Sequence, residues 1–155
     1  MRVEVQEKTD DHTIATWGRV VLLVFSRRAS AQGITGVHAF LRAWAPTQVG
    51  GVVLVSVVSP QPPKPPDDET RAALAHATAN PVPGMMGAGT LYEGGGFIAA
   101  SIRAMVSRLQ LLRTGERLVF FRSTDEAAAW AAEALGAKEL TGEGLAEAIR
   151  TVRAG

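Results

Sequence analysis

The sequence predicts an α/β domain in which a mostly parallel central sheet lies between two layers of helices. Three short runs are apolar at almost every position, and a helix-like segment follows each of them. A strand with one solvated face alternates apolar and polar residues, whereas a strand covered on both faces is apolar throughout. The runs are Val20–Phe25, Val52–Val58 and Leu118–Phe121. We therefore expect them in the middle layer, with helices on both faces.

An N-terminal antiparallel hairpin is expected before the first apolar run. Arg2–Lys8 alternates valines with polar residues, which is the period of a half-exposed strand. Asp10 and Asp11 suit a turn, after which His12–Trp17 runs back. Gly18 tolerates a positive φ and allows a tight turn into the buried strand.

The first helix is predicted between the first two apolar runs. Ser30 is suited to cap its start, and Pro46 stops it after about Ala45 because proline lacks the backbone N–H. Its large apolar residues fall three or four positions apart, so they form one stripe along the helix. They are Ile34, Val37, Leu41 and Trp44.

A proline-rich connection and a second helix follow the second run. Ser59–Pro66 contains five prolines, which favour a stiff, extended chain. Asp67 or Asp68 then caps a helix that ends near Ala79. This helix is rich in alanine and only weakly amphipathic, so we expect it in the surface layer.

The segment Val82–Tyr92 is the hardest to assign, because four of its residues are glycine or proline. We expect Gly89–Tyr92 to be the next parallel strand, with Met85 and Met86 in the approach to it. Gly94, Gly95 and Gly96 then open a strongly amphipathic helix over Phe97–Arg113.

The C-terminal part reads as a capped helix and a short final helix. Ser123 and Glu126 form a capping box, and Gly136 suits the residue just after the helix. The final helix runs from about Gly142 to Val152. We expect one domain over residues 1–155, with its core at about 10–137 and a helical extension at 138–155.

Composition excludes several classes of function. The formal charge is +1, which gives no net attraction to nucleic acid or anionic membranes. No cysteine is present, so disulfides, thiolate metal sites and cysteine nucleophiles are excluded. No run reaches the ~18 apolar residues of a membrane span, and the charged start does not fit a signal peptide. We expect a cytoplasmic protein that binds no nucleic acid.

The motifs give no catalytic, cofactor or metal site. His12, His38 and His76 lack the spacing of metal ligands, and we expect His38 to be a hydrogen-bonded, half-buried residue. The glycines at 94–96 have the position of a phosphate-binding loop without its spacing, so a turn is favoured. Arg27 and Arg28 follow a buried strand, where a solvated pair is favoured over an anion site.

The chain resembles the STAS superfamily of anti-sigma-factor antagonists, whose relatives include CRAL-TRIO-like lipid carriers. The resemblance is carried by the hairpin leading into GRVVLLVFS, by VVLVSVV, and by LVFFRSTDEAAAWAAEAL. It covers roughly residues 10 to 137. In regulatory members, a serine or threonine after the third main strand is phosphorylated by a partner kinase. The acceptors that this implies here are Ser59 and Thr70, in a loop that also holds Asp67 and Asp68, although the surrounding sequence departs from the family motif.

The leading hypothesis is a non-enzymatic, STAS-like regulatory domain that contacts another protein. The carboxyl edge of an open α/β sheet is where sites generally lie, so the candidate interaction loops are those around Arg27, Ser59 and Tyr92. A homodimer through the first strand or the final helix is a further option. The alternative function is a carrier or sensor of a small apolar or nucleotide-like ligand, and an enzyme of unrecognised class is the third. The carrier's pocket would be lined by Met85, Met86, Phe97 and Met105.

Overall fold

Six strands form one continuous sheet whose order in space follows the chain. The computed structural model describes residues 1–59, 67–93 and 119–155. The strands pair in the order β1-β2-β3-β4-β5-β6. β2 is antiparallel to both of its neighbours, β1 and β3, and β3 to β6 are parallel. The strands span β1 Val3–Lys8, β2 His12–Trp17, β3 Val20–Phe25, β4 Val52–Val58, β5 Met85–Tyr92 and β6 Val119–Phe121.

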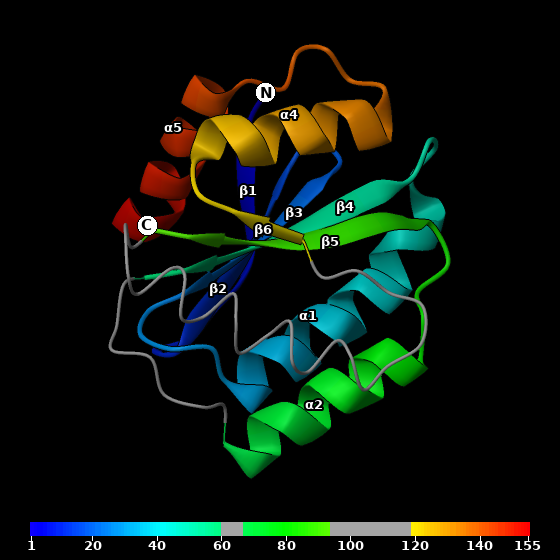
Figure 1. Cartoon of the computed structure of the whole chain (residues 1–155), viewed down its shortest axis with the longest axis vertical. Helices are drawn as coiled ribbons and strands as arrows, with labels where there is room; N and C mark the ends of the chain where they lie inside the picture. The colour runs from blue at the N-terminus through cyan, green and yellow to red at the C-terminus, as the bar shows by residue number, and fades with distance from the viewer. Residues whose placement is uncertain (60–66, 94–118) are drawn as a thin grey trace.

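Helices cover both faces of this sheet, which confirms the predicted fold class (Figure 1). α1 (Ala31–Trp44) and α2 (Asp68–Ala79) lie on one face, and a 3₁₀ turn over Ala45–Thr47 follows α1. α4 (Thr124–Leu135) and α5 (Gly142–Ala154) lie on the other face. Within the described ranges, no helix combines the length and apolar character needed to cross a membrane.

The apolar runs are buried to different degrees. Every residue of β3 is buried, because it is an inner strand covered by helices on both faces. β4 has half-buried residues at Leu54, Ser56 and Val58, and β6 is half-buried at its first two described residues. β6 is the last strand of the sheet, so only one neighbour covers its side.

Two separate cores lie above and below the sheet. Alternate residues of β3 point to opposite faces, so Leu22 joins the core under α4 and α5, and Leu23 joins the core over α1. α5 packs into the same core as Leu22 through its buried residues Leu145, Ile149 and Val152. The final helix is therefore part of the folded body.

Predicted caps are found where the sequence placed them. Ser30, Asp67 and Ser123 each accept a hydrogen bond from a backbone N–H three residues later. Gly136 ends α4 at a φ of 63°, a conformation that favours glycine.

β5 corrects the prediction for residues 82–92. The strand begins at Met85, so Met85 and Met86 belong to it and do not merely lead into it. Gly87 permits this strand to pass under α4, because a Cβ there would lie 2.8 Å from Trp130 Cζ2. The helix predicted over Phe97–Arg113 lies outside the described residues.

Candidate functional site

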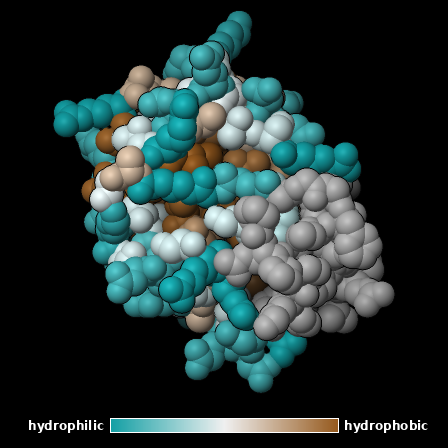
Figure 2. All heavy atoms as spheres, turned by 90° about the vertical axis from the view of Figure 1, so that its left-hand side faces the viewer, coloured by the Kyte–Doolittle hydropathy of each residue, from teal (hydrophilic) through white to brown (hydrophobic). Residues whose placement is uncertain are grey.

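The carboxyl edge of the sheet gathers segments from along the whole chain. β3 to β6 end there, β2 begins there, and α5 ends there. Figure 2 views this edge, where apolar surface is visible in a hollow between hydrophilic side chains. This is the edge at which open α/β sheets generally hold ligands.

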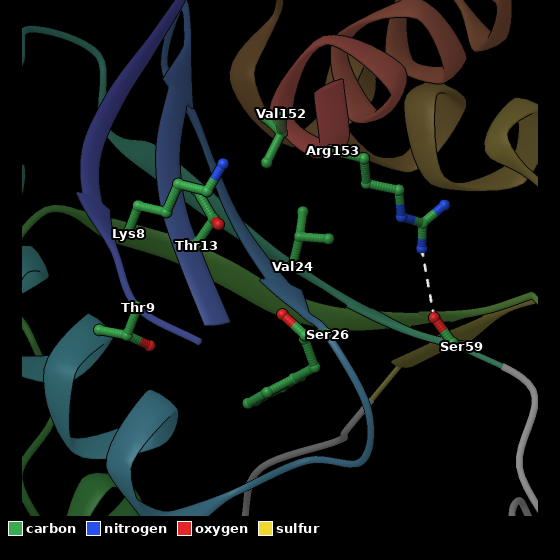
Figure 3. A pocket seen from close by; sticks show the side chains of 9 residues that line it. Lys8, Thr9, Thr13, Val24, Ser26, Ser59, Val152 and Arg153 are labelled. Carbon is green, nitrogen blue, oxygen red and sulfur yellow. Dashed lines mark hydrogen bonds between the residues drawn. The ribbon is translucent and has the colours of Figure 1, made fainter. Parts of the chain in front are cut away.

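A pocket of about 260 Å³ opens at this edge on the side of α5. Figure 3 shows Lys8 and Arg153 on opposite sides of the pocket, with Val24 between them. Hydroxyl and apolar groups complete the walls. The lining residues are Lys8, Thr9, Thr13, Val24, Phe25, Ser26, Ser59, Val152 and Arg153.

An ion pair closes one side of this pocket. The Arg153 guanidinium binds both carboxylate oxygens of Glu93, and its Nη1 donates to Oε2 at 2.8 Å. Its Nη2 also donates to Ser59 Oγ at 3.4 Å (Figure 3). The hydrogen bonds to Glu93 raise the pKa of Arg153 above its usual range. Arg153 is therefore a neutralised cation that joins α5 to the ends of β4 and β5.

A hydrogen-bonded cluster around His12 lies behind the same edge, on the face covered by α1. The His12 side chain is 1% exposed, and its Nε2 lies 2.8 Å from Glu7 Oε2. Its Nδ1 lies 3.2 Å from Thr9 Oγ1 and 3.4 Å from an Asp11 carboxylate oxygen. The hydroxyl of Ser30 donates to that same Asp11 oxygen. The cluster thus ties the β1–β2 turn to the start of α1.

The loops that hold Arg28 and Asp67 come together at the starts of α1 and α2. The pKa of the Asp67 carboxyl is lowered, chiefly by a hydrogen bond from the Thr70 hydroxyl and then by one from the Thr70 N–H at 2.7 Å. The positive charges of Arg28 and Arg71 lower it further. Arg27, Arg28, Asp67 and Asp68 are all exposed, so this part of the edge carries exposed charges of both signs.

The lowered pKa of Asp67 predicts an acid-dependent loss of stability. Its stabilising effect is complete above the ordinary carboxyl pKa of 3.8 and is lost as the pH falls through the lower folded-state value. Asn caps a helix about as well as Asp but carries no charge. We therefore expect Asp67→Asn to reduce the drop in urea midpoint between about pH 5 and about pH 2.5. An equal drop in both proteins would contradict this, and Asp10→Asn serves as the control for a turn carboxylate.

The two candidate phosphate acceptors lie in different surroundings. Ser59 is half-buried at the wall of the pocket, where it accepts a hydrogen bond from Arg153. Thr70 is 3% exposed, and its hydroxyl donates to Asp67 in the first turn of α2. A kinase would reach Thr70 only if that turn unwound.

The other two histidines lie between α1 and α2. His38 is half-buried, and its Nε2 lies 2.8 Å from the carbonyl oxygen of Asn80, which confirms the expectation for this residue. The His76 ring packs edge-on against it, with 5.7 Å between ring centroids. In the described parts of the chain, no group of three His, Asp or Glu side chains is arranged to hold a metal ion.

Of the remaining predicted site residues, some lie outside the described residues and others lie away from the pocket. Gly94, Gly95 and Gly96 lie outside the described residues, as do Phe97 and Met105 of the predicted apolar pocket. Met85 and Met86 start β5, so they lie at the amino edge, and Met86 is 57% exposed.

Apart from Ser59, sequence reasoning missed the residues that line the pocket. Lys8, Thr13 and Arg153 come from β1, β2 and α5. The hairpin pattern contained one usable signal, because Lys8 and Thr13 are cross-strand partners and so project from the same face. Nothing in the linear sequence places Arg153 beside them.

Comparison with known proteins adds no relative. No family model matches the chain, and no curated protein or solved structure matches it. The resemblance to STAS domains thus rests on the burial pattern of the sequence, and it stays a prediction.

Proposed function

We propose that the protein is a non-enzymatic, STAS-like regulatory domain that binds another protein through the carboxyl edge of its sheet. One observation carries this proposal: the exposed pair Arg27-Arg28 precedes α1, the exposed pair Asp67-Asp68 lies at the start of α2, and Arg28 is near enough for its charge to lower the pKa of Asp67. A surface that carries charges of both signs selects a partner of complementary charge and suppresses binding of others.

The structural roles of His12 and His38 support this proposal. His12 is buried between its hydrogen-bonding partners, and His38 is held by the carbonyl of Asn80. A general base must reach a substrate proton, and neither ring is free to do so without giving up a bond that joins two elements. Loops that surround a rigid sheet are, in contrast, well suited to recognition.

The partner is proposed to be a different protein, with a homodimer as the alternative. β1 is an edge strand, and five of its six residues are exposed. Its pairing with β2 shifts register between Val5 and Glu7, and charged Glu4, Glu7 and Lys8 lie along it. A bulge and charges are the usual protections of an edge strand against pairing with a second copy.

Charge reversal at the proposed surface tests this function. Protein with Arg27→Glu and Arg28→Glu should lose a stoichiometric partner that the unaltered protein captures from the extract of its native cells. The matched control is Arg42→Glu with Arg150→Glu, because both arginines are exposed on helices away from this loop. Capture of the same partners in equal amount by all three proteins would refute the proposed surface. Light scattering of the purified protein separates a homodimer from a partner of another kind.

A further inference from the structure

One row of side chains across the sheet changes from apolar to polar at the pocket. Val24, Val57, Leu91 and Phe121 are neighbours from β3 to β6, and all four are buried under α4 and α5. On β2 and β1 the same row continues through Thr13 and Lys8. Directly paired residues of antiparallel strands project to the same face. Lys8 ends this row at the exposed edge strand, and Thr13 is a buried polar residue between it and the apolar part of the row.

The hydroxyl of Thr13 opens into the pocket. Thr13 is 6% exposed, and its side chain has no hydrogen-bond partner among the residues that the structure describes. No described side-chain polar atom is both sealed from solvent and unpartnered. The Thr13 oxygen must therefore face the cavity that the residue lines. Buried polar groups in proteins nearly always have a partner, and no described residue supplies one here, so a ligand in the cavity would provide it.

The pocket also carries one uncompensated positive charge. Lys8 has no ion pair within the described ranges, whereas Arg153 is neutralised by Glu93. The C-terminal end of α5, which carries the negative end of its helix dipole, adjoins the pocket at Val152 and Arg153. A ligand with two negative charges would be repelled by Glu93 and by this helix end. The charges favour an anion of charge one.

The volume and the lining of the pocket limit the size and polarity of the uncharged part of the ligand. A volume of about 260 Å³ lies just below the range of about 300–1,000 Å³ that holds drug-sized molecules. Val24, Phe25 and Val152 supply an apolar wall, and Ser26 adds a second hydroxyl without a partner among the described residues. The site is therefore suited to a small molecule with a short apolar part.

We propose that this pocket binds a small organic acid that carries one carboxylate and an apolar body of a few carbons. The carboxylate accepts hydrogen bonds from the Lys8 ammonium and the hydroxyls of Thr13 and Ser26. The apolar body packs on Val24 and Val152. This activity goes beyond the proposed binding of a protein partner and does not depend on it.

Titration of isotope-labelled protein with three probes tests the ligand class by NMR. Butyrate should cause saturable shifts of the Thr13, Ser26 and Ser59 amides. Butyramide, which has the same shape without the charge, should bind at least about tenfold more weakly, because a hydrogen bond to a charged group is worth a factor of that order. Equal binding of butyramide, tighter binding of inorganic phosphate, or no saturable shift with butyrate would each overturn the proposal.

Two substitutions locate the site. Thr13→Val keeps the shape of the side chain and removes only its hydroxyl, and Lys8→Met removes only the charge of a long chain. Each should weaken butyrate binding by about tenfold or more. Lys138→Met, in an exposed position between α4 and α5, is the charge control and should leave binding unchanged. Thr13→Val should not lower the thermal midpoint. If binding survives both substitutions, the anion lies elsewhere and the assignment of this pocket is wrong.

Discussion

Replacing Leu22 with alanine is expected to lower the free energy of unfolding by about 3 kcal/mol, within the range measured for buried leucines. Leu22 is fully buried in the middle of β3, opposite Ala15 of β2 and Val55 of β4. Its neighbours are held in an inner strand between two helix layers, so they cannot move far to fill the space that is left. Urea unfolding followed by circular dichroism measures the change.

A volume-conserving change at the same residue shows whether the loss of stability comes from the missing side-chain volume. Leu22→Met should cost less than about 1.5 kcal/mol, because methionine refills most of the lost volume. A loss below about 1 kcal/mol for Leu22→Ala would mean that this face of β3 repacks freely or is solvated. That result would contradict the three-layer architecture.

Replacing His12 with alanine is the second change expected to be large, at about 3 kcal/mol from a lost charged hydrogen bond together with a cavity. The imidazole fills space that α1 cannot enter. Gly33 and Gly36 face it, and a Cβ on Gly33 would lie only 3.3 Å from His12 Cγ. Without the ring, the helix presents glycine backbone to an empty space, and Glu7 loses its partner. Chemical unfolding at neutral pH measures the loss.

His76→Ala is the matched control for this prediction. His76 is an exposed residue of α2 whose ring contacts His38 from outside. Its loss should cost less than about 1 kcal/mol, as for surface positions in general. If His12→Ala and His76→Ala cost the same, the cluster around His12 contributes little to the join between the hairpin and α1.

The strands and caps could be predicted because their causes are local. A run such as Val20–Phe25 has no polar position to expose, so burial on both faces follows from the residues themselves. Ser30, Asp67 and Ser123 act on backbone groups three residues away. Nothing distant along the chain is needed for either conclusion.

The start of β5 and the pocket could not be predicted because their causes are distant in sequence. Gly87 fits in a strand under α4 because the Trp130 ring occupies the space that a side chain there would need. The pocket needs Lys8 and Arg153 at one edge, and these residues lie near opposite ends of the chain. Only the packing of α5 against the sheet brings the two together.

The side chain of Arg19 fixes the opposite end of the molecule. Its Nη1 donates to the carbonyl oxygens of Gly50 at 2.6 Å and Gly51 at 3.1 Å, and its Nη2 donates to that of Leu135 at 2.9 Å. Gly50 follows the helix of one layer, and Leu135 ends a helix of the other. The Arg19 guanidinium therefore links the two helix layers by hydrogen bonds at the amino edge of the sheet. Arg19 at the amino edge and Arg153 at the carboxyl edge thus tie helices to the sheet at both of its ends, so the loss of either guanidinium is expected to loosen one end and leave the other held.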